Sequence, residues 1–121
     1  MKESKVIDIV EQGDVAIVSF LVPAISSSDQ FESMAKDTRS YLADYNPQKL
    51  VVDFTGVKFF SSQVLGLLVD AWKKLNEHGG SIAISGIIPG LGRVFKITHL
   101  ETLFDFYPDT QSAIKALRDK A

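Results

Sequence analysis

Apolar and polar residues along the chain follow two patterns, one typical of buried strands and one typical of amphipathic helices. The segment 49–75, KLVVDFTGVKFFSSQVLGLLVDAWKKL, contains both. It begins with a nearly continuous apolar run at 50–54, which is typical of a strand covered on both faces. After Gly56, apolar residues recur at steps of three and four over 64–75, as they do on one face of a helix. The segment therefore predicts a buried strand, a tight loop and an amphipathic helix.

The rest of the chain predicts further strands and helices. Strand-like runs at 5–11 and 15–22 flank the turn residues Gly13-Asp14, so an antiparallel hairpin is expected. A helix should follow between Ser27 and Asn46, because Ser27 and Gln30 fit a capping box. The remaining expected elements are a strand at 81–85, a short helix after Pro89-Gly90, a strand at 103–106 and a last helix capped by Asp109. This order predicts a single α/β domain over residues 1–121, with an N-terminal β-hairpin and then alternating strands and helices around a mixed sheet.

The inward faces of these elements define an expected core. Its central members are Val51, Val52, Leu65, Leu68, Trp72, Ile82, Ile84 and Phe95. The helix between Ser27 and Asn46 should bury a stripe of its own, made of Phe31, Met34, Thr38, Tyr41, Leu42 and Tyr45.

Composition narrows the possible functions by exclusion. The apolar fraction of 45% and the charged fraction of 23% are ordinary for a soluble globular protein. A net charge of −2 argues against a nucleic-acid-binding protein, whose affinity depends on neutralising phosphates. The chain has no cysteine, which excludes disulfides and thiolate chemistry. The apolar run 64–69 is too short to cross a membrane and the N-terminus lacks a signal-peptide pattern, so we expect a cytoplasmic protein with no membrane insertion.

Candidate chemistry is concentrated at the start of the central helix. Ser61 and Ser62 could cap its free backbone N–H groups, or a bound or covalent phosphate could be stabilised there. Asp53 ends a strand, where ligands often gather in α/β sheets. No second carboxylate or histidine lies at a spacing that would complete a site, so a hydrogen bond from Asp53 to the loop backbone is the favoured interpretation. His78 and His99 show no metal-ligand spacing, and no metal or cofactor is expected.

The segment from Asp53 to Gly66, DFTGVKFFSSQVLG, resembles the signature of the STAS domain, the fold of bacterial anti-sigma-factor antagonists. In that family a strand and a hydrophobic loop precede an Asp-Ser pair and a helix that opens with Gly-Leu-Gly. Matched residue by residue, the phosphoacceptor serine of the family falls on Ser62, the preceding Asp on Ser61 and the first Gly on Val64. The segment 81–104, SIAISGIIPGLGRVFKITHLETLF, is similar to a later strand, helix and strand of the family.

The resemblance implies a regulatory module that acts through protein–protein contacts. The unphosphorylated domain would bind an anti-sigma factor that is also a serine kinase, and phosphorylation of Ser62, or failing that Ser61, would release it. We expect the partner-binding residues to be Phe59, Phe60, Ser61, Ser62 and Gln63.

Two alternatives remain open. Some STAS domains serve as scaffolds or accessory subunits, for example in transporter complexes, and Ser61 in place of Asp favours that role. A small enzyme that uses Asp53 and the serines would need a general base within hydrogen-bond reach of Ser62. Neither histidine is near Ser62 in sequence, and we expect a protein without enzymatic activity.

Overall fold

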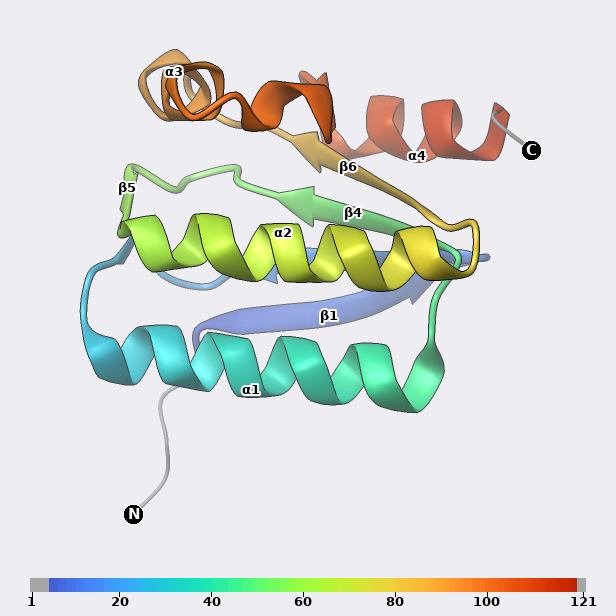
Figure 1. Cartoon of the computed structure of the whole chain (residues 1–121), viewed down its shortest axis with the longest axis horizontal. Coiled ribbons are helices and arrows are strands. Elements are labelled where there is room, and N and C mark those ends of the chain that lie inside the picture. Colours follow the sequence, from blue (N-terminus) through green and yellow to red (C-terminus); the bar gives the residue numbers. More distant parts are fainter. Residues whose placement is uncertain (1–4, 120–121) are drawn as a thin grey trace.

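A mixed five-stranded sheet lies between two layers of helices in the computed structural model, which describes residues 5–119 (Figure 1). The order of its strands is β1-β2-β4-β6-β7, with β1 and β2 antiparallel and the other neighbours parallel. The bounds of these strands are β1 Ile7–Gln12, β2 Val15–Phe20, β4 Lys49–Asp53, β6 Ser81–Ser85 and β7 Asp105–Tyr107. The helices are α1 Ser28–Tyr45, α2 Ser62–Glu77, α3 Pro89–Ile97, the 3₁₀ turn η1 Leu100–Thr102 and α4 Thr110–Asp119. The prediction of an α/β domain with an N-terminal β-hairpin and a mixed sheet is confirmed.

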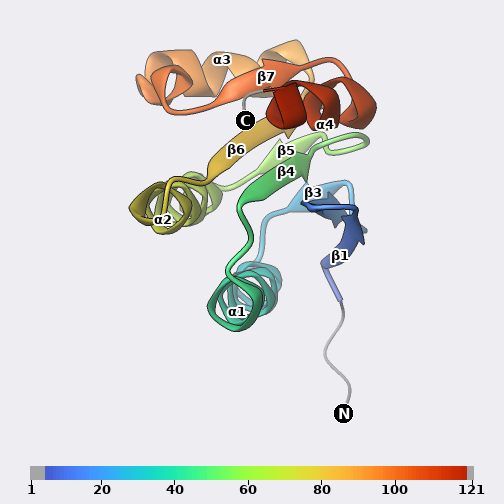
Figure 2. The ribbon, with the colours of Figure 1, turned by 90° about the vertical axis from the view of Figure 1, so that its right-hand side faces the viewer.

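The two faces of the sheet carry separate parts of the core. Side chains of β4 alternate between them, so that Leu50 and Val52 pack in the cluster beneath α1 and α2, whereas Val51 packs with α4. Figure 2 shows α1 and α2 on one side of the sheet and α4 on the other. Burial on both faces explains why the sequence of β4 is apolar without alternation.

Local signals in the sequence correctly marked several boundaries. Gly13 adopts φ +63° in the turn between β1 and β2. Ser27 caps α1, because its hydroxyl accepts a hydrogen bond from the Gln30 N–H while the Gln30 side chain accepts one from the Ser27 N–H. Asn46 ends α1 in the left-handed conformation. Asp109 accepts a hydrogen bond of 2.8 Å from the Ser112 N–H at the start of α4, and this bond lowers the pKa of Asp109.

Other features differ from the expectation. The strands β3 (Ala24–Ile25) and β5 (Phe59–Phe60) were not predicted, and they form a second, two-stranded sheet. Tyr45 was expected in the core but is 65% exposed, because it lies at the end of α1 and stacks on the outside of Tyr41 with ring centroids 4.8 Å apart. Phe31, Tyr41 and Trp72 were also expected in the core, and they pack against it but are only partly buried.

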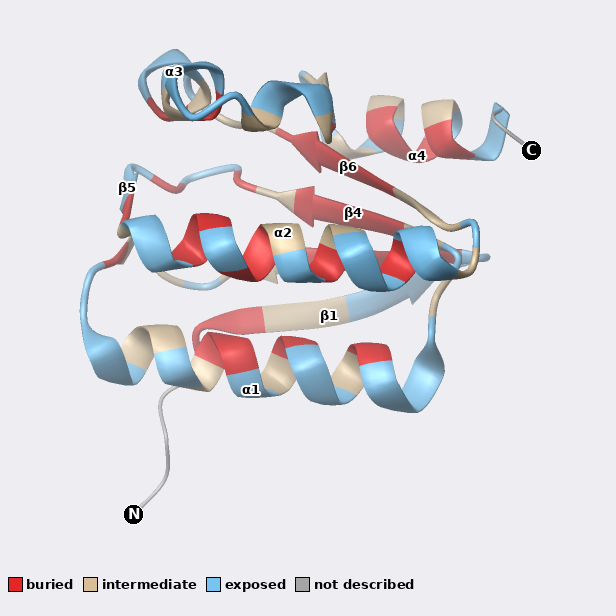
Figure 3. Ribbon diagram, in the orientation of Figure 1, coloured by how far each residue is buried: buried red, intermediate tan, exposed pale blue. Residues whose placement is uncertain are grey.

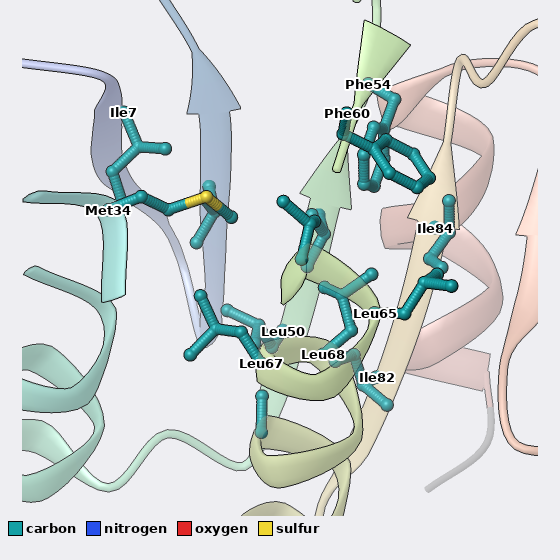
Figure 4. Packing of buried hydrophobic residues seen from close by; sticks show 14 of the residues in the cluster. Ile7, Met34, Leu50, Phe54, Phe60, Leu65, Leu67, Leu68, Ile82 and Ile84 are labelled. Atoms are coloured by element: carbon teal, nitrogen blue, oxygen red, sulfur yellow. The ribbon is translucent and has the colours of Figure 1, made fainter. Parts of the chain in front are cut away.

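The remaining predicted core residues are buried, and α2 shows the pattern most clearly (Figure 3). Buried and exposed positions alternate along this helix at helical spacing, and Leu65 and Leu68 face Ile82 and Ile84 of β6 (Figure 4). In the described part of the chain, no helix is both long and apolar enough to span a membrane.

We expect Leu68→Ala to destabilise the protein by about 2–5 kcal/mol, because it leaves a cavity beneath α2 where the Leu68 side chain is only 3% exposed. Urea denaturation followed by circular dichroism measures this change. An unchanged midpoint would mean that the packed face of α2 has been wrongly assigned.

Candidate functional site

The segment 54–62, which we call the serine loop, joins the end of β4 to the start of α2 and is anchored along its whole length. The N–H groups of Lys58 and Ser61 donate to the carbonyl oxygens of Pro23 and Ile25 at 2.7 and 3.0 Å. Between these bonds β5 pairs in parallel with β3, and Phe60 lies opposite Ile25. At the other end the Phe54 N–H donates to the Ser85 carbonyl at 2.8 Å. The loop therefore has a defined backbone that presents its side chains in fixed directions.

One set of loop side chains points into the core. Phe54, Val57 and Phe60 are buried, and Figure 4 shows the rings of Phe54 and Phe60 beside each other. The centroid of the Phe60 ring lies 5.5 Å from that of Phe54 and 6.3 Å from that of Phe95. Phe60 was predicted to bind a partner, but it belongs to this inward-facing set. Its side chain is only 6% exposed because the pairing of β5 with β3 turns it inward.

A second set of side chains points outward. Phe59 is 51% exposed, Ser62 and Gln63 are exposed, and Ser61 is partly buried. These four residues are the predicted partner-binding set without Phe60, and we call them the serine surface. Aromatic side chains are enriched in protein-interaction interfaces, and Phe59 is the residue of this set that could fill that role.

Neither serine of this surface caps α2 through its side chain. Ser61 occupies the N-cap position with φ −78° and ψ 161°, and it makes no side-chain cap hydrogen bond. Its carbonyl oxygen instead accepts from the Val64 N–H at 3.0 Å. Ser62 is the first residue of α2, and its hydroxyl forms no hydrogen bond with another residue among 5–119. The capping interpretation, which holds for Ser27 of α1, therefore does not account for Ser61 and Ser62.

The electrostatic setting of Ser62 favours an anion. The first turn of α2 contains no acidic residue, and free N–H groups at a helix N-terminus stabilise negative charge. A phosphate on the Ser62 hydroxyl would therefore lie at the positive end of the helix dipole.

Asp53 is held by a structural network, as its position before the loop suggested. Its Oδ1 accepts hydrogen bonds from the Thr55 N–H at 3.3 Å, the Thr55 hydroxyl at 2.8 Å and the Ser85 hydroxyl at 3.0 Å. Gly86 makes room for this network, because a Cβ there would lie 2.3 Å from the Thr55 hydroxyl oxygen. No local sequence pattern marks Ser85 and Gly86 as supports of the loop, since only the pairing of β4 with β6 brings them there.

Among the residues that the structure describes, none that could act as a general base is hydrogen-bonded to Ser62. Asp53 makes its hydrogen bonds to Thr55 and Ser85, and His78 lies at the opposite end of α2 with its Nε2 3.0 Å from the Pro47 carbonyl oxygen. His99 follows α3 in a left-handed conformation. Within residues 5–119, no group of three or more histidines and carboxylates could hold a metal ion.

Gly66 lies one helical turn beyond Ser62, on the exposed side of α2, and its conformation does not require glycine. A Cβ added at this position would meet no atom within 4 Å. We therefore expect Gly66→Ala to stabilise the protein by about 1 kcal/mol, the usual difference between these residues inside a helix. Urea denaturation tests this, with Gly79→Ala as a destabilised control because Gly79 has φ +78°. A lower denaturation midpoint for Gly66→Ala than for the unchanged protein would show that a Cβ at this position is not accommodated.

Solved structures of other proteins share this fold. An anti-sigma-factor antagonist (STAS) domain protein from Planctomyces limnophilus is 26% identical, with a TM-score of 0.85 over 93% of this chain and 97% of that chain. An anti-sigma factor antagonist from Mycobacterium paratuberculosis is 25% identical, with a TM-score of 0.82 over 98% of both chains. The Bacillus cell fate determinant SpoIIAA in its phosphorylated form is 15% identical, with a TM-score of 0.70 over 91% of this chain and 97% of that chain.

The sequence match agrees with these structural likenesses. It extends from the N-terminal hairpin to the last helix, and it includes the serine loop and α2. Residues 4–113 match the STAS domain model, and the chain therefore belongs to the STAS domain family.

Proposed function

We propose that this chain is an anti-sigma-factor antagonist, a regulatory protein that binds an anti-sigma factor and is switched by phosphorylation of Ser62. The observation that carries the proposal is the position of Ser62. It is the exposed first residue of α2, and its hydroxyl is engaged by no other described residue. A kinase could approach such a hydroxyl without unfolding the loop that presents it.

The serine surface provides a physical basis for a switch. An unmodified partner complex would bury Phe59 and cover the serines, which are neutral. A phosphate adds a charge of roughly −1.5 to −2, and covering it would remove its water without supplying a countercharge. The N-terminus of α2 stabilises an exposed anion by about 0.3–1 kcal/mol, so the phosphorylated chain should stay folded. This gain is too small to offset the lost hydration in a complex, and the phosphorylated chain should therefore dissociate from its partner.

The similarity to named antagonists supports the choice of partner. The relatives from Planctomyces limnophilus and Mycobacterium paratuberculosis are both described as anti-sigma-factor antagonists. By this analogy the partner is an anti-sigma factor that is also a serine kinase, and the setting is the bacterial cytoplasm. We propose no catalytic activity for the chain itself, because no described base contacts Ser62.

A second candidate function is a STAS scaffold or accessory subunit that is not phosphorylated. Ser61 and Val64, which stand where the family has Asp and Gly, favour this candidate. Ser61 removes a negative charge that would repel a phosphate, but it also removes a contact that a kinase could use for recognition.

Phosphorylation by a cognate kinase separates the two candidates. We expect incubation with ATP and the anti-sigma kinases of the source organism, each checked for ATP binding, to add one phosphate at Ser62, as located by peptide mass spectrometry. Ser62→Ala should abolish the modification, and Ser61→Ala is the matched control that should retain it. Modification of Ser61 alone would move the switch by one residue. A kinase that binds the chain but modifies neither serine would favour the scaffold.

A further inference from the structure

A cleft of about 430 Å³ lies between α3, η1 and β7, and none of the serine-surface residues lines it. Ile87, Gly92, Arg93, Lys96, Glu101 and Phe106 form its walls. Figure 2 shows α3 and β7 together at the end of the sheet that is far from β1. The volume falls in the range of about 300–1,000 Å³ that is usual for small-molecule sites.

The floor of the cleft is apolar and firmly supported. Ile87 and Phe106 are partly buried and pack against the main core cluster. The Phe106 ring meets the fully buried Phe95 ring edge-on, with centroids 5.2 Å apart. The exposed part of Phe106 therefore offers a fixed aromatic surface, against which another flat ring can pack.

Two cations stand on the rim. Arg93 and Lys96 are three residues apart on α3, both are exposed, and both line the cleft. Within residues 5–119 neither forms an ion pair, not even with Glu101 of the same cleft. Their charges are therefore available to an anion, and an arginine can bind a carboxylate through two parallel hydrogen bonds.

Gly92 keeps the cleft open. Its φ is not in the left-handed region, and a Cβ at this position would make only an ordinary contact of 3.8 Å with Ile87. Neither packing nor backbone conformation therefore requires glycine here, although glycine costs a helix about 1 kcal/mol relative to alanine. The missing side chain leaves space that a longer one would fill.

From this combination we infer that the cleft binds a small organic acid with a flat aromatic body. The ring lies on Phe106 and Ile87, the carboxylate pairs with Arg93 and Lys96, and a hydroxyl or amino group of the ligand donates to Glu101. The site is independent of the serine surface, so its test does not depend on the proposed phosphorylation.

The test uses 6-hydroxy-2-naphthoate as probe and follows the amide spectrum of the full 121-residue chain by NMR. We expect saturable shifts at Gly92, Arg93 and Phe106 and none at Ser62. The neutral 6-hydroxy-2-naphthamide should bind at least about tenfold more weakly, since a charge-assisted hydrogen bond contributes more than 1.4 kcal/mol. Absence of saturable shifts, or shifts centred elsewhere, would overturn the inference.

Two pairs of variants locate the site. The double variant Arg93→Gln/Lys96→Gln should weaken binding of the naphthoate by about tenfold or more. The double variant Lys73→Gln/Lys74→Gln removes the same charge from the exposed face of α2 and should leave the affinity unchanged. Gly92→Leu should abolish binding by filling the cleft. Gly90→Leu is its control, because Gly90 is in the same helix, has open space and does not line the cleft. If the two double-glutamine variants bound the naphthoate with equal affinity, the assignment would be refuted, even if Gly92→Leu failed to fold.

Discussion

Phe60→Asp is expected to unfold most of the protein at room temperature. The Phe60 side chain is 6% exposed and packs against the rings of Phe54 and Phe95. Truncation of a buried phenylalanine costs about 3–5 kcal/mol, and a carboxylate in its place adds the cost of burying a charge. The sum is comparable to the whole stability of a typical domain, about 5–15 kcal/mol. Circular dichroism and urea denaturation measure this loss.

Phe59→Asp is the matched control, since it introduces the same charge at the neighbouring residue. Phe59 is 51% exposed, so we expect its replacement to change stability by no more than about 1 kcal/mol. It should nevertheless weaken binding to the anti-sigma factor, because it removes the large apolar side chain from the serine surface. Equal stability losses in the two variants would contradict the assigned directions of these side chains.

Phosphorylation of Ser62 is expected to weaken binding of the anti-sigma factor by about a hundredfold or more. An unpaired charge enclosed in an interface commonly costs about 2–5 kcal/mol, and 2.7 kcal/mol corresponds to a factor of one hundred. Isothermal titration calorimetry compares the unmodified chain with the chain that carries phosphoserine at position 62. The melting temperature of the phosphoserine chain should differ little from that of the unmodified chain, because the N-terminus of α2 stabilises an anion.

Two controls separate charge from the loss of the hydroxyl. Ser62→Ala should bind like the unmodified chain and should not respond to kinase and ATP. Gln63→Glu places a single negative charge at the next exposed position and should weaken binding by a smaller factor. Full-strength binding of the phosphoserine chain would place the interface away from the serine surface.

Local sequence patterns predicted the main elements because each depends mostly on nearby residues. The apolar run of β4, the helical spacing of α2 and the capping box of α1 are properties of short segments, and the structure has all three. The serine pair was also located correctly at the start of α2. These signals were sufficient to predict the order of the main strands and helices.

The orientation of the serine loop could not be predicted in the same way. Phe59 and Phe60 are chemically identical neighbours, and only the pairing of β5 with β3, more than 30 residues earlier in the chain, turns one outward and the other inward. The missing side-chain cap at the start of α2 is a similar case. Ser27 and Ser61 both occupy N-cap positions, but the side chain of Ser27 caps its helix and that of Ser61 does not. Capping depends on the entry path of the chain as well as on residue type.

The most direct test of the proposed function is displacement of a sigma factor from its anti-sigma factor. A purified complex of the two, drawn from the source organism, is mixed with the unmodified chain or with the phosphoserine-62 chain and separated by size-exclusion chromatography. The unmodified chain should release free sigma factor in proportion to its concentration, whereas the phosphorylated chain should release almost none. A sigma factor that stays bound in both mixtures, or is released equally in both, would contradict the proposed switch.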